Sequence, residues 1–251
     1  MTVLAPHRVR CGTIWGGISS VNLDIATNSL TASIYSSASD GERGGDIYYF
    51  SVCGYDMLTR IAVADLQGHG EGVAKLSGWL YDSLEERLNS LDGAGVLEDL
   101  NRPVYRPSFD AITTAAVIGF CVGDPNLYLS YAGHPPVYLR RHAEAAWRPL
   151  AVGSADEATN LPLGILPHMR YLQAEIPLQP KDRLFLYTDG VLDCPDATGE
   201  PFGAERLLGV LKRHESRGLP EVKAGVLESL RAHSGGTLEH DDVTLVFLEV
   251  N

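Results

Sequence analysis

Apolar and polar positions follow different patterns in successive parts of the chain, and the first part predicts β-strands. Up to residue 65, segments rich in β-branched and aromatic residues are separated by polar or glycine-bearing turns. Strands joined by short turns pair in antiparallel fashion. The predicted strands of this part are 30–36, 46–53 and 58–64.

After residue 70 the period changes, and apolar side chains recur every three or four positions. This spacing places them on one face of a long helix, which begins directly beyond the segment that contains Asp65. The stripe consists of Val73, Leu76, Leu80, Leu84, Leu88 and Leu91. We expect Gly93 and Gly95 to end the helix.

The second half of the chain predicts more strands, then two helices and a last strand. Glycine and proline punctuate residues 151–171, which indicates a surface loop. The predicted strands are 109–122, 127–139, 183–188 and 243–250, and the predicted helices are 204–214 and 220–233. Runs of strands with helices grouped between them indicate an α+β layered fold, and the length fits a single domain spanning 1–251.

Charge and composition narrow the class of protein. Acidic residues outnumber basic ones by 32 to 20, which disfavours nucleic acid or an anionic membrane as the main partner. No apolar run reaches the ~20 residues of a membrane span, and the first residues lack the apolar run of a signal peptide. We therefore expect a cytoplasmic protein. None of the four cysteines forms a Cys-x-x-Cys pair, so buried free thiols are expected.

Aspartates far apart in the sequence stand where predicted strands meet turns. They are Asp46, Asp65, Asp189, Asp241 and Asp242. Each one alone is more simply explained as a turn residue, because aspartate is common in turns. Together they predict one acidic pocket, since crowded carboxylates repel one another unless a cation lies between them. Ligands that are all oxygen atoms favour hard divalent metals.

Asp65 is at the centre of this prediction because Gly68 and Gly70 follow it closely. The glycines let the backbone turn tightly, so a main-chain carbonyl can face the same pocket as the carboxylate. A carboxylate between two cations supports the activation of water for in-line displacement at phosphorus. The chain has no evident Ser-His-Asp or Cys-His arrangement, so no protein nucleophile is expected.

Six segments, in this order, carry a resemblance to a known family: Gly44-Gly-Asp46, Ala64-Asp-Leu-Gln-Gly-His-Gly70, Tyr131-Ala-Gly-His-Pro-Pro136, Leu161-Pro-Leu-Gly164, Leu186-Tyr-Thr-Asp-Gly190 and His240-Asp-Asp-Val-Thr244. They resemble the bacterial branch of the metal-dependent serine/threonine protein phosphatases, related to phosphatase 2C. This branch is named for stage II sporulation protein E and the regulators RsbU and RsbX. The resemblance implies an αββα sandwich, in which helices flank two antiparallel sheets.

The resemblance also implies a cofactor, Mn²⁺ or Mg²⁺, with two or more ions bound. The implied metal ligands are Asp46, Asp65, the Leu66 carbonyl, Asp189 and Asp241. Asp65 would bridge two metals, with Asp46 and Leu66 on one and Asp189 and Asp241 on the other site or sites. Asp242 would support the ligands.

The implied activity is the dephosphorylation of a phosphorylated STAS-domain protein, an anti-anti-sigma factor or stressosome subunit, by water that the metals activate. The partner would act in a partner-switching pathway. Little chain precedes residue 40, so we expect a stand-alone catalytic domain of the RsbX kind. Two alternatives are open: a non-catalytic partner-binding module of the same fold, and a hydrolase of small phosphate esters.

Several other residues have two interpretations each. His69 is either a general acid for the leaving oxygen or a residue that orients its loop. Arg43 either binds the substrate phosphate or is a solvated turn residue. His134 either fixes a turn near the site or takes part in catalysis. Trp79 and Tyr81 lie off the helix stripe and either cover a neighbouring element or mark a partner surface.

Overall fold

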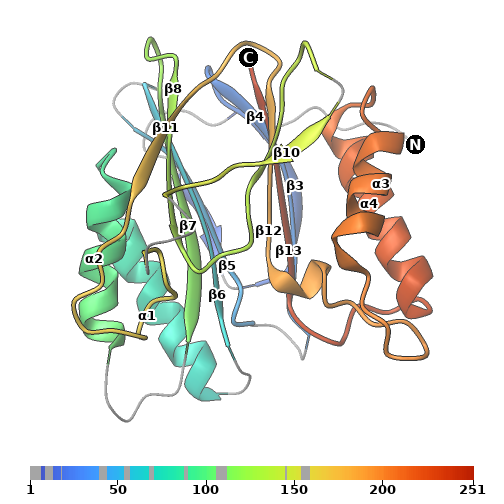
Figure 1. Ribbon diagram of the computed structural model, residues 1–251, viewed down its shortest axis with the longest axis horizontal. Helices are drawn as coiled ribbons and strands as arrows, with labels where there is room; N and C mark the ends of the chain where they lie inside the picture. Colours follow the sequence, from blue (N-terminus) through green and yellow to red (C-terminus); the bar gives the residue numbers. More distant parts are fainter. Residues whose placement is uncertain are drawn as a thin grey trace.

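The two layers of β-sheet lie face to face, and a pair of helices covers the outer side of each (Figure 1). The computed structural model describes residues 7–8, 14–17, 19–39, 44–53, 57–67, 71–87, 90–105, 112–144, 146–153 and 159–251. Helices α1 (Glu71–Arg87) and α2 (Gly93–Val104) cover one sheet, and α3 (Gly203–Arg213) and α4 (Leu219–Ser234) cover the other. The expected α+β sandwich is confirmed.

In the part of the chain that the structure describes, the sheet beneath α3 and α4 has seven strands. Their order is β1 (His7–Arg8), β3 (Val21–Ala26), β4 (Leu30–Ser37), β13 (Val243–Val250), β12 (Arg183–Tyr187), β9 (Tyr138–Arg140) and β10 (Trp147–Pro149). All neighbours are antiparallel except β1 and β3, which run parallel. The expectation of a purely antiparallel sheet therefore fails only at this edge.

Among the described residues, the sheet beneath α1 and α2 has six strands, and all of its strand pairs are antiparallel. Their order is β11 (Gln173–Pro177), β8 (Asn126–Ala132), β7 (Thr113–Cys121), β6 (Leu58–Leu66), β5 (Ile47–Cys53) and β2 (Ile14–Gly17). Apolar side chains from both sheets, such as Ile34, Ile61 and Leu186, form the central core. Burying this apolar surface is the main favourable contribution to folding.

The single strand predicted over 127–139 is wrong. β8 ends at Ala132 and β9 begins at Tyr138, and the two strands belong to different sheets. Gly133 between them has a φ of 64°, a conformation that glycine adopts without steric cost. Pro135 and Pro136 follow and cannot donate to a strand ladder. This segment therefore carries the chain from one layer of the sandwich to the other.

The long helix predicted after residue 70 ends earlier than expected, and its supposed terminators begin another helix. α1 stops at Arg87, and Gly93 is the first residue of α2. The Asp92 carboxylate accepts a hydrogen bond from the Gly95 amide at 2.9 Å, which caps the start of α2. A Cβ on Gly93 would lie 3.1 Å from Ser130 Oγ, so the glycine lets α2 approach β8 closely.

The apolar stripe of α1 does face the sheet. Leu80 and Leu84 are completely buried there. Tyr81 packs its ring on Tyr49 of β5 at a centroid distance of 6.2 Å, so it covers a neighbouring strand. Trp79 remains 36% exposed, which leaves it on the outer surface of the helix.

The surface loop predicted over 151–171 is partly wrong. Leu163, Met169 and Tyr171 are buried in the core beneath α2, and Leu163 forms a β-bridge with Thr113. Glycines and prolines in this segment indicated turns, but the apolar residues between them fill the helix–sheet interface. The short strands β10 and β11 were not predicted either.

Cys194 is a buried free thiol, whereas Cys121 is free but half-buried. None of the described helices is long and apolar enough to cross a membrane.

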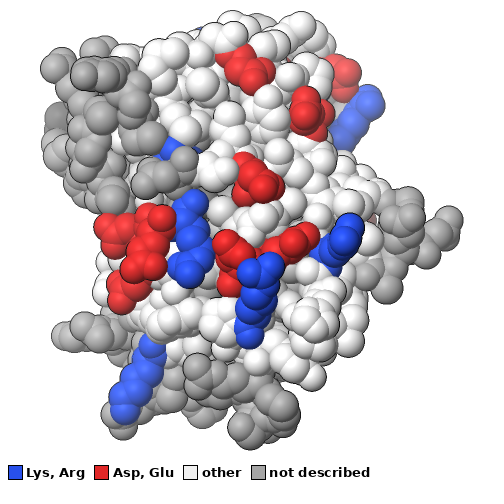
Figure 2. All heavy atoms as spheres, turned by 90° about the vertical axis from the view of Figure 1, so that its left-hand side faces the viewer, with Lys and Arg blue, Asp and Glu red and all other residues white. Residues whose placement is uncertain are grey.

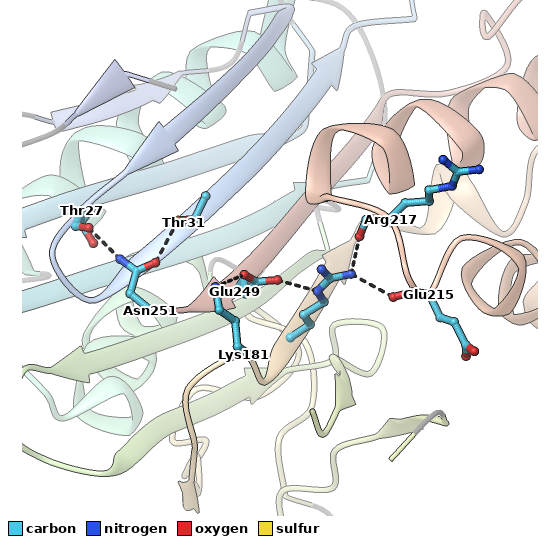
Figure 3. A network of polar contacts seen from close by, with 8 residues as sticks. Thr27, Thr31, Lys181, Glu215, Arg217, Glu249 and Asn251 are labelled. Atoms are coloured by element: carbon cyan, nitrogen blue, oxygen red, sulfur yellow. Dashed lines mark hydrogen bonds and ion pairs between the residues drawn. The ribbon is translucent and has the colours of Figure 1, made fainter. Parts of the chain in front are cut away.

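Ion pairs hold the end of β12 and β13 that is remote from the aspartates (Figure 3). Arg183 Nε donates to Glu249 at 2.7 Å, and Lys181 donates to the same carboxylate at 2.9 Å. Arg183 Nη1 also donates to the main-chain carbonyls of Glu215 and Arg217, which follow α3. These contacts fix the relative position of β12 and β13, whose opposite ends lead into Asp189 and Asp241.

Candidate functional site

One end of the sandwich brings together the four aspartates that the sequence singles out as ligands. Asp46 immediately precedes β5, and Asp65 is the second-last residue of the adjacent β6. Asp189 opens the 3₁₀ turn η1 (Asp189–Val191) after β12, and Asp241 lies just before β13. Each sheet therefore contributes two of them. Asp65 lies within its strand, opposite Thr114, instead of in a turn.

Asp65 is electrostatically the centre of the group. Burial, and then the negative charges of Asp189 and Asp241, raise its pKa to about 8. Burial also raises the pKa of Asp189 and of Asp241. Keeping these carboxylates ionised at neutral pH is unfavourable without a nearby positive charge. The arrangement thus favours a cation beside Asp65.

Asp46 is 3% exposed, and its two carboxylate oxygens differ in their surroundings. Oδ2 accepts hydrogen bonds from the hydroxyls of Thr188 and Thr244, each at 2.7 Å. Oδ1 is buried and has no hydrogen-bond partner in the part of the chain that the structure describes. Burial and the charge of Asp65 raise the pKa of Asp46 well above its ordinary value, although the two threonines oppose this. A buried oxygen without a partner is costly, and a cation would satisfy it.

The main-chain carbonyl of Leu66 lies close to the turn that carries Asp46. A Cβ on Gly45 would stand only 2.6 Å from Leu66 O, so no other residue fits there without a shift of the backbone. Because glycine has no side chain, the Leu66 carbonyl of β6 can approach the turn that precedes β5. Leu66 therefore lies beside Asp46 and directly after Asp65 in β6.

Asp242 holds the turn before β5 in place. Its Oδ1 accepts from the Ser39 amide at 2.7 Å, and its Oδ2 accepts from the amides of Gly45 and, at 3.2 Å, Asp46. Both oxygens are thus used in hydrogen bonds to the backbone. These contacts give Asp242 a role in fixing Asp46 without itself facing a metal.

The donor set fits a hard divalent ion, although side chains alone do not complete a coordination shell. Among the described residues, no three His, Cys, Asp or Glu side chains converge closely enough to hold an ion by themselves. Main-chain carbonyl oxygens and water are ordinary ligands of Mg²⁺ and Mn²⁺, and Mg²⁺ usually keeps several waters. The free Oδ1 of Asp46 and the Leu66 carbonyl are such oxygen donors.

The remaining candidates lie elsewhere or outside what is described. Arg43 and His69 are outside the described residues. His134 lies in the segment between β8 and β9, where its Nδ1 is 2.9 Å from the carbonyl of Pro135. Burial lowers the pKa of His134 to about 4, so the ring is neutral at pH 7. These contacts favour its interpretation as a residue that fixes the turn.

The buried, neutral His134 predicts a specific dependence of stability on pH. Its pKa is about 4 in the folded protein, against ~6.5 in the unfolded chain. The unfolded chain therefore binds more protons between these values, and stability falls as the pH drops from ~6.5 towards ~4. We expect this fall to be steeper than in His134→Gln by a total approaching about 3 kcal/mol. Urea unfolding at several pH values measures both slopes, and equal slopes would contradict the assignment.

Thr188 and Thr244 are site residues that sequence reasoning missed. Both stand inside segments already singled out for their aspartates, Tyr-Thr-Asp-Gly and Asp-Asp-Val-Thr. Threonine is common in strands, so nothing in a single sequence separates these two from structural threonines. Only the pairing of β12 with β13 shows that both hydroxyls point to Asp46.

The outer surface beside this site carries charges of both signs. Figure 2 views the face covered by α1 and α2 and shows acidic and basic side chains interspersed there. On α2, for example, Arg102 pairs with Asp99 at 3.2 Å. The described part of this face is therefore not a uniformly basic surface of the kind that binds nucleic acid.

Comparison with known proteins places the chain in a family. The family model described as stage II sporulation protein E (SpoIIE) matches residues 56–251. The chain belongs to the SpoIIE family. Among curated relatives, it is 25% identical over 246 residues to the phosphoserine phosphatase RsbP of Bacillus subtilis, covering 90% of this chain and 56% of RsbP. The SpoIIE-family chain spans between 35% and 59% of the length of the curated relatives it matches.

Solved structures show the same fold. The SiaA-PP2C domain of Pseudomonas aeruginosa is 22% identical with a TM-score of 0.74, covering 88% of this chain and 86% of that one. RsbX in complex with magnesium is 17% identical with a TM-score of 0.66, covering 92% and 100%. The catalytic domain of the phosphatase PstP, in complex with two manganese ions, is 19% identical with a TM-score of 0.59, covering 88% and 98%. The SpoIIE-family chain thus has the fold of PP2C-type phosphatase domains.

Proposed function

We propose that this chain is a metal-dependent phosphatase that removes phosphate from phosphoserine or phosphothreonine in a protein. The observation that most strongly supports this proposal is the group of aspartates from both sheets. Their pKa values are raised, and one buried oxygen of Asp46 has no hydrogen-bond partner among the described residues. Membership of the SpoIIE family and similarity to the phosphoserine phosphatase RsbP support this reaction. We assign the whole of residues 1–251 to a single phosphatase domain.

The proposed cofactor is Mn²⁺ or Mg²⁺, two or more ions, held by Asp46, Asp65, the Leu66 carbonyl, Asp189 and Asp241. RsbX with magnesium and PstP with two manganese ions support this choice. When bound, such ions activate water and neutralise charge on the phosphoryl group.

The aspartates of the site contribute negative charge and fixed positions to the proposed metal site. Asp65 lies within the electrostatic reach of Asp46, Asp189 and Asp241, so it is the group best placed to hold more than one ion. Asp242 fixes the backbone amides before β5. Because the aspartates lie at the ends of strands in two packed sheets, their positions are set before any substrate arrives.

The proposed substrate is a phosphorylated STAS-domain regulator of a partner-switching pathway in the cytoplasm. Its phosphoserine or phosphothreonine would bind at the end of the sandwich where the aspartates lie. Nucleic acid and membranes are not proposed as partners, given the excess of acidic residues.

A rate comparison tests the function. The purified chain is incubated with Mn²⁺ and either a phosphorylated STAS-domain protein or free phosphoserine, with metal-free samples as controls. We expect metal-dependent phosphate release that is much faster on the phosphoprotein. Equal rates on free phosphoserine would favour a small-ester hydrolase, and tight binding without turnover at saturating Mn²⁺ would favour a binding module.

Metal addition is expected to stabilise the chelator-treated protein. A ligand at 100 times its dissociation constant that binds only the folded state stabilises by about 2.7 kcal/mol. For a chain of this size the melting temperature should then rise by roughly 5–10 °C. Thermal unfolding with and without Mn²⁺ measures the rise. An equal rise in a potassium salt of the same ionic strength would show that the effect is not specific.

A further inference from the structure

Two threonines at the end of one sheet donate hydrogen bonds to an aspartate of the other sheet. Thr188 follows β12 and Thr244 belongs to β13, whereas Asp46 precedes β5 in the opposite sheet. Both hydroxyls donate to the same oxygen, Oδ2 of Asp46, at 2.7 Å. Both threonines are completely buried, so water does not compete for these bonds.

The direction of each hydrogen bond in this network is determined. The Thr244 amide donates to Thr188 Oγ1 at 3.0 Å, so that hydroxyl accepts one bond and donates the other. Ser36 Oγ lies 3.0 Å from Thr244 Oγ1. The one hydroxyl proton of Thr244 is committed to Asp46, and therefore Ser36 donates to Thr244. Residues of β4 and β13, with the residue that follows β12, thus hold one carboxylate in a single orientation.

In this orientation, one carboxylate oxygen of Asp46 remains available to bind a cation. Oδ2 has two donors, whereas Oδ1 is buried with no partner among the described residues. A cation can therefore bind through Oδ1 alone. Ca²⁺ takes six to eight oxygens and often binds a carboxylate through both of its oxygens, whereas Mg²⁺ demands a tight six-ligand shell. A carboxylate restricted to one oxygen suits the smaller ion.

We propose that Thr188 and Thr244 are positioning residues that restrict Asp46 to one metal-binding oxygen, and that they thereby set a preference for Mn²⁺ and Mg²⁺ over Ca²⁺. This inference rests on the proposed metal site. It assigns to the threonines a role in metal selection in addition to their role in packing.

The test measures metal binding without turnover. Calorimetric titration of the full chain with Mn²⁺, Mg²⁺ and Ca²⁺ gives the three dissociation constants for the wild type, Thr188→Val, Thr244→Val and the hydroxyl-retaining Thr188→Ser and Thr244→Ser. We expect each valine variant to bind Mn²⁺ about 10–100-fold more weakly, the range for loss of a group that orients a metal ligand. Ca²⁺ binding should weaken less or strengthen, because Oδ2 becomes available. The serine variants should keep the wild-type ratio of Mn²⁺ to Ca²⁺ affinity.

Thr244→Val is the cleaner variant, because Thr188→Val also leaves the Thr244 amide without its acceptor. Circular dichroism of the metal-free proteins checks folding. If neither valine variant folds, equal affinities of the wild type for Ca²⁺ and Mn²⁺ would still overturn the proposal. A folded Thr244→Val with an unchanged ratio, or serine variants that lose the ratio, would also overturn it. Absence of Mn²⁺ and Mg²⁺ binding by the wild type would instead overturn the proposed function.

Discussion

Replacing Asp65 with asparagine is expected to lower the rate of phosphate release by at least about 100-fold, the scale of losing one preorganised electrostatic contact at a reacting centre. The asparagine keeps the shape of the side chain and removes the charge that faces Asp46, Asp189 and Asp241. In the metal-free protein the same change should increase stability. The raised pKa of Asp65 means that its ionisation opposes folding at neutral pH, and a neutral side chain removes that cost, of order 1 kcal/mol or more.

Two measurements on each protein distinguish the loss of the Asp65 charge from a general loss of folding. Turnover is measured on the phosphoprotein at a Mn²⁺ concentration that saturates the variant, and thermal unfolding is measured after chelation. Asp82→Asn, an exposed aspartate of α1, is the matched control and should leave both unchanged. An Asp65→Asn protein that binds Mn²⁺ and turns over at the wild-type rate would exclude the proposed mechanism. A variant that is less stable without metal would contradict the electrostatic account.

The hydrophobic pattern predicted those elements that bury a continuous or regularly spaced set of apolar residues. β13 has the predicted limits, Val243–Val250, and α4, which corresponds to the predicted helix 220–233, buries Val222, Val226 and Leu230. Errors arose where tertiary contacts overrule a local signal. Gly93 was taken as a helix terminator, yet it begins α2 because the helix must approach Ser130 without a side chain between them. The turn before Pro135 was missed because apolar residues continue on both sides of it, in strands of different sheets.

The candidate site was accessible from the sequence only in part. A carboxylate near the end of a predicted strand, with a glycine beside it at Asp46 and Asp189, is a visible signal, and it indicated the aspartates that the two sheets bring to one end of the sandwich. The roles of Thr188, Thr244 and Asp242 depend on the register between distant strands, such as Thr244 opposite Ser36. No local pattern encodes that register, because it results from burial of whole strands against the opposite sheet.

Substituting Gly190 with alanine is expected to be the most disruptive single-methyl change at the site. Gly190 lies in η1 directly after Asp189, and a Cβ there would overlap the main-chain carbonyl oxygen of Asp242. That oxygen belongs to the backbone leading into β13, so it cannot move aside cheaply. Relief of the overlap must push η1 away from β13 and separate Asp189 from Asp241. Such overpacking should cost about 3 kcal/mol or more and lower the melting temperature by roughly 6–12 °C.

Gly78→Ala supplies the matched control, because it adds the same methyl group in open space. Gly78 is in the middle of α1, and apart from its chain neighbours and the backbone of its own helix no atom lies within 4 Å of its added Cβ. Alanine is the better helix former, so this variant should gain about 0.5–1 kcal/mol. The two substitutions therefore have opposite expected signs in urea unfolding, and Gly190→Ala should also bind Mn²⁺ more weakly. Wild-type stability and Mn²⁺ affinity in Gly190→Ala would contradict the close contact between η1 and Asp242, on which the relative placement of Asp189 and Asp241 depends.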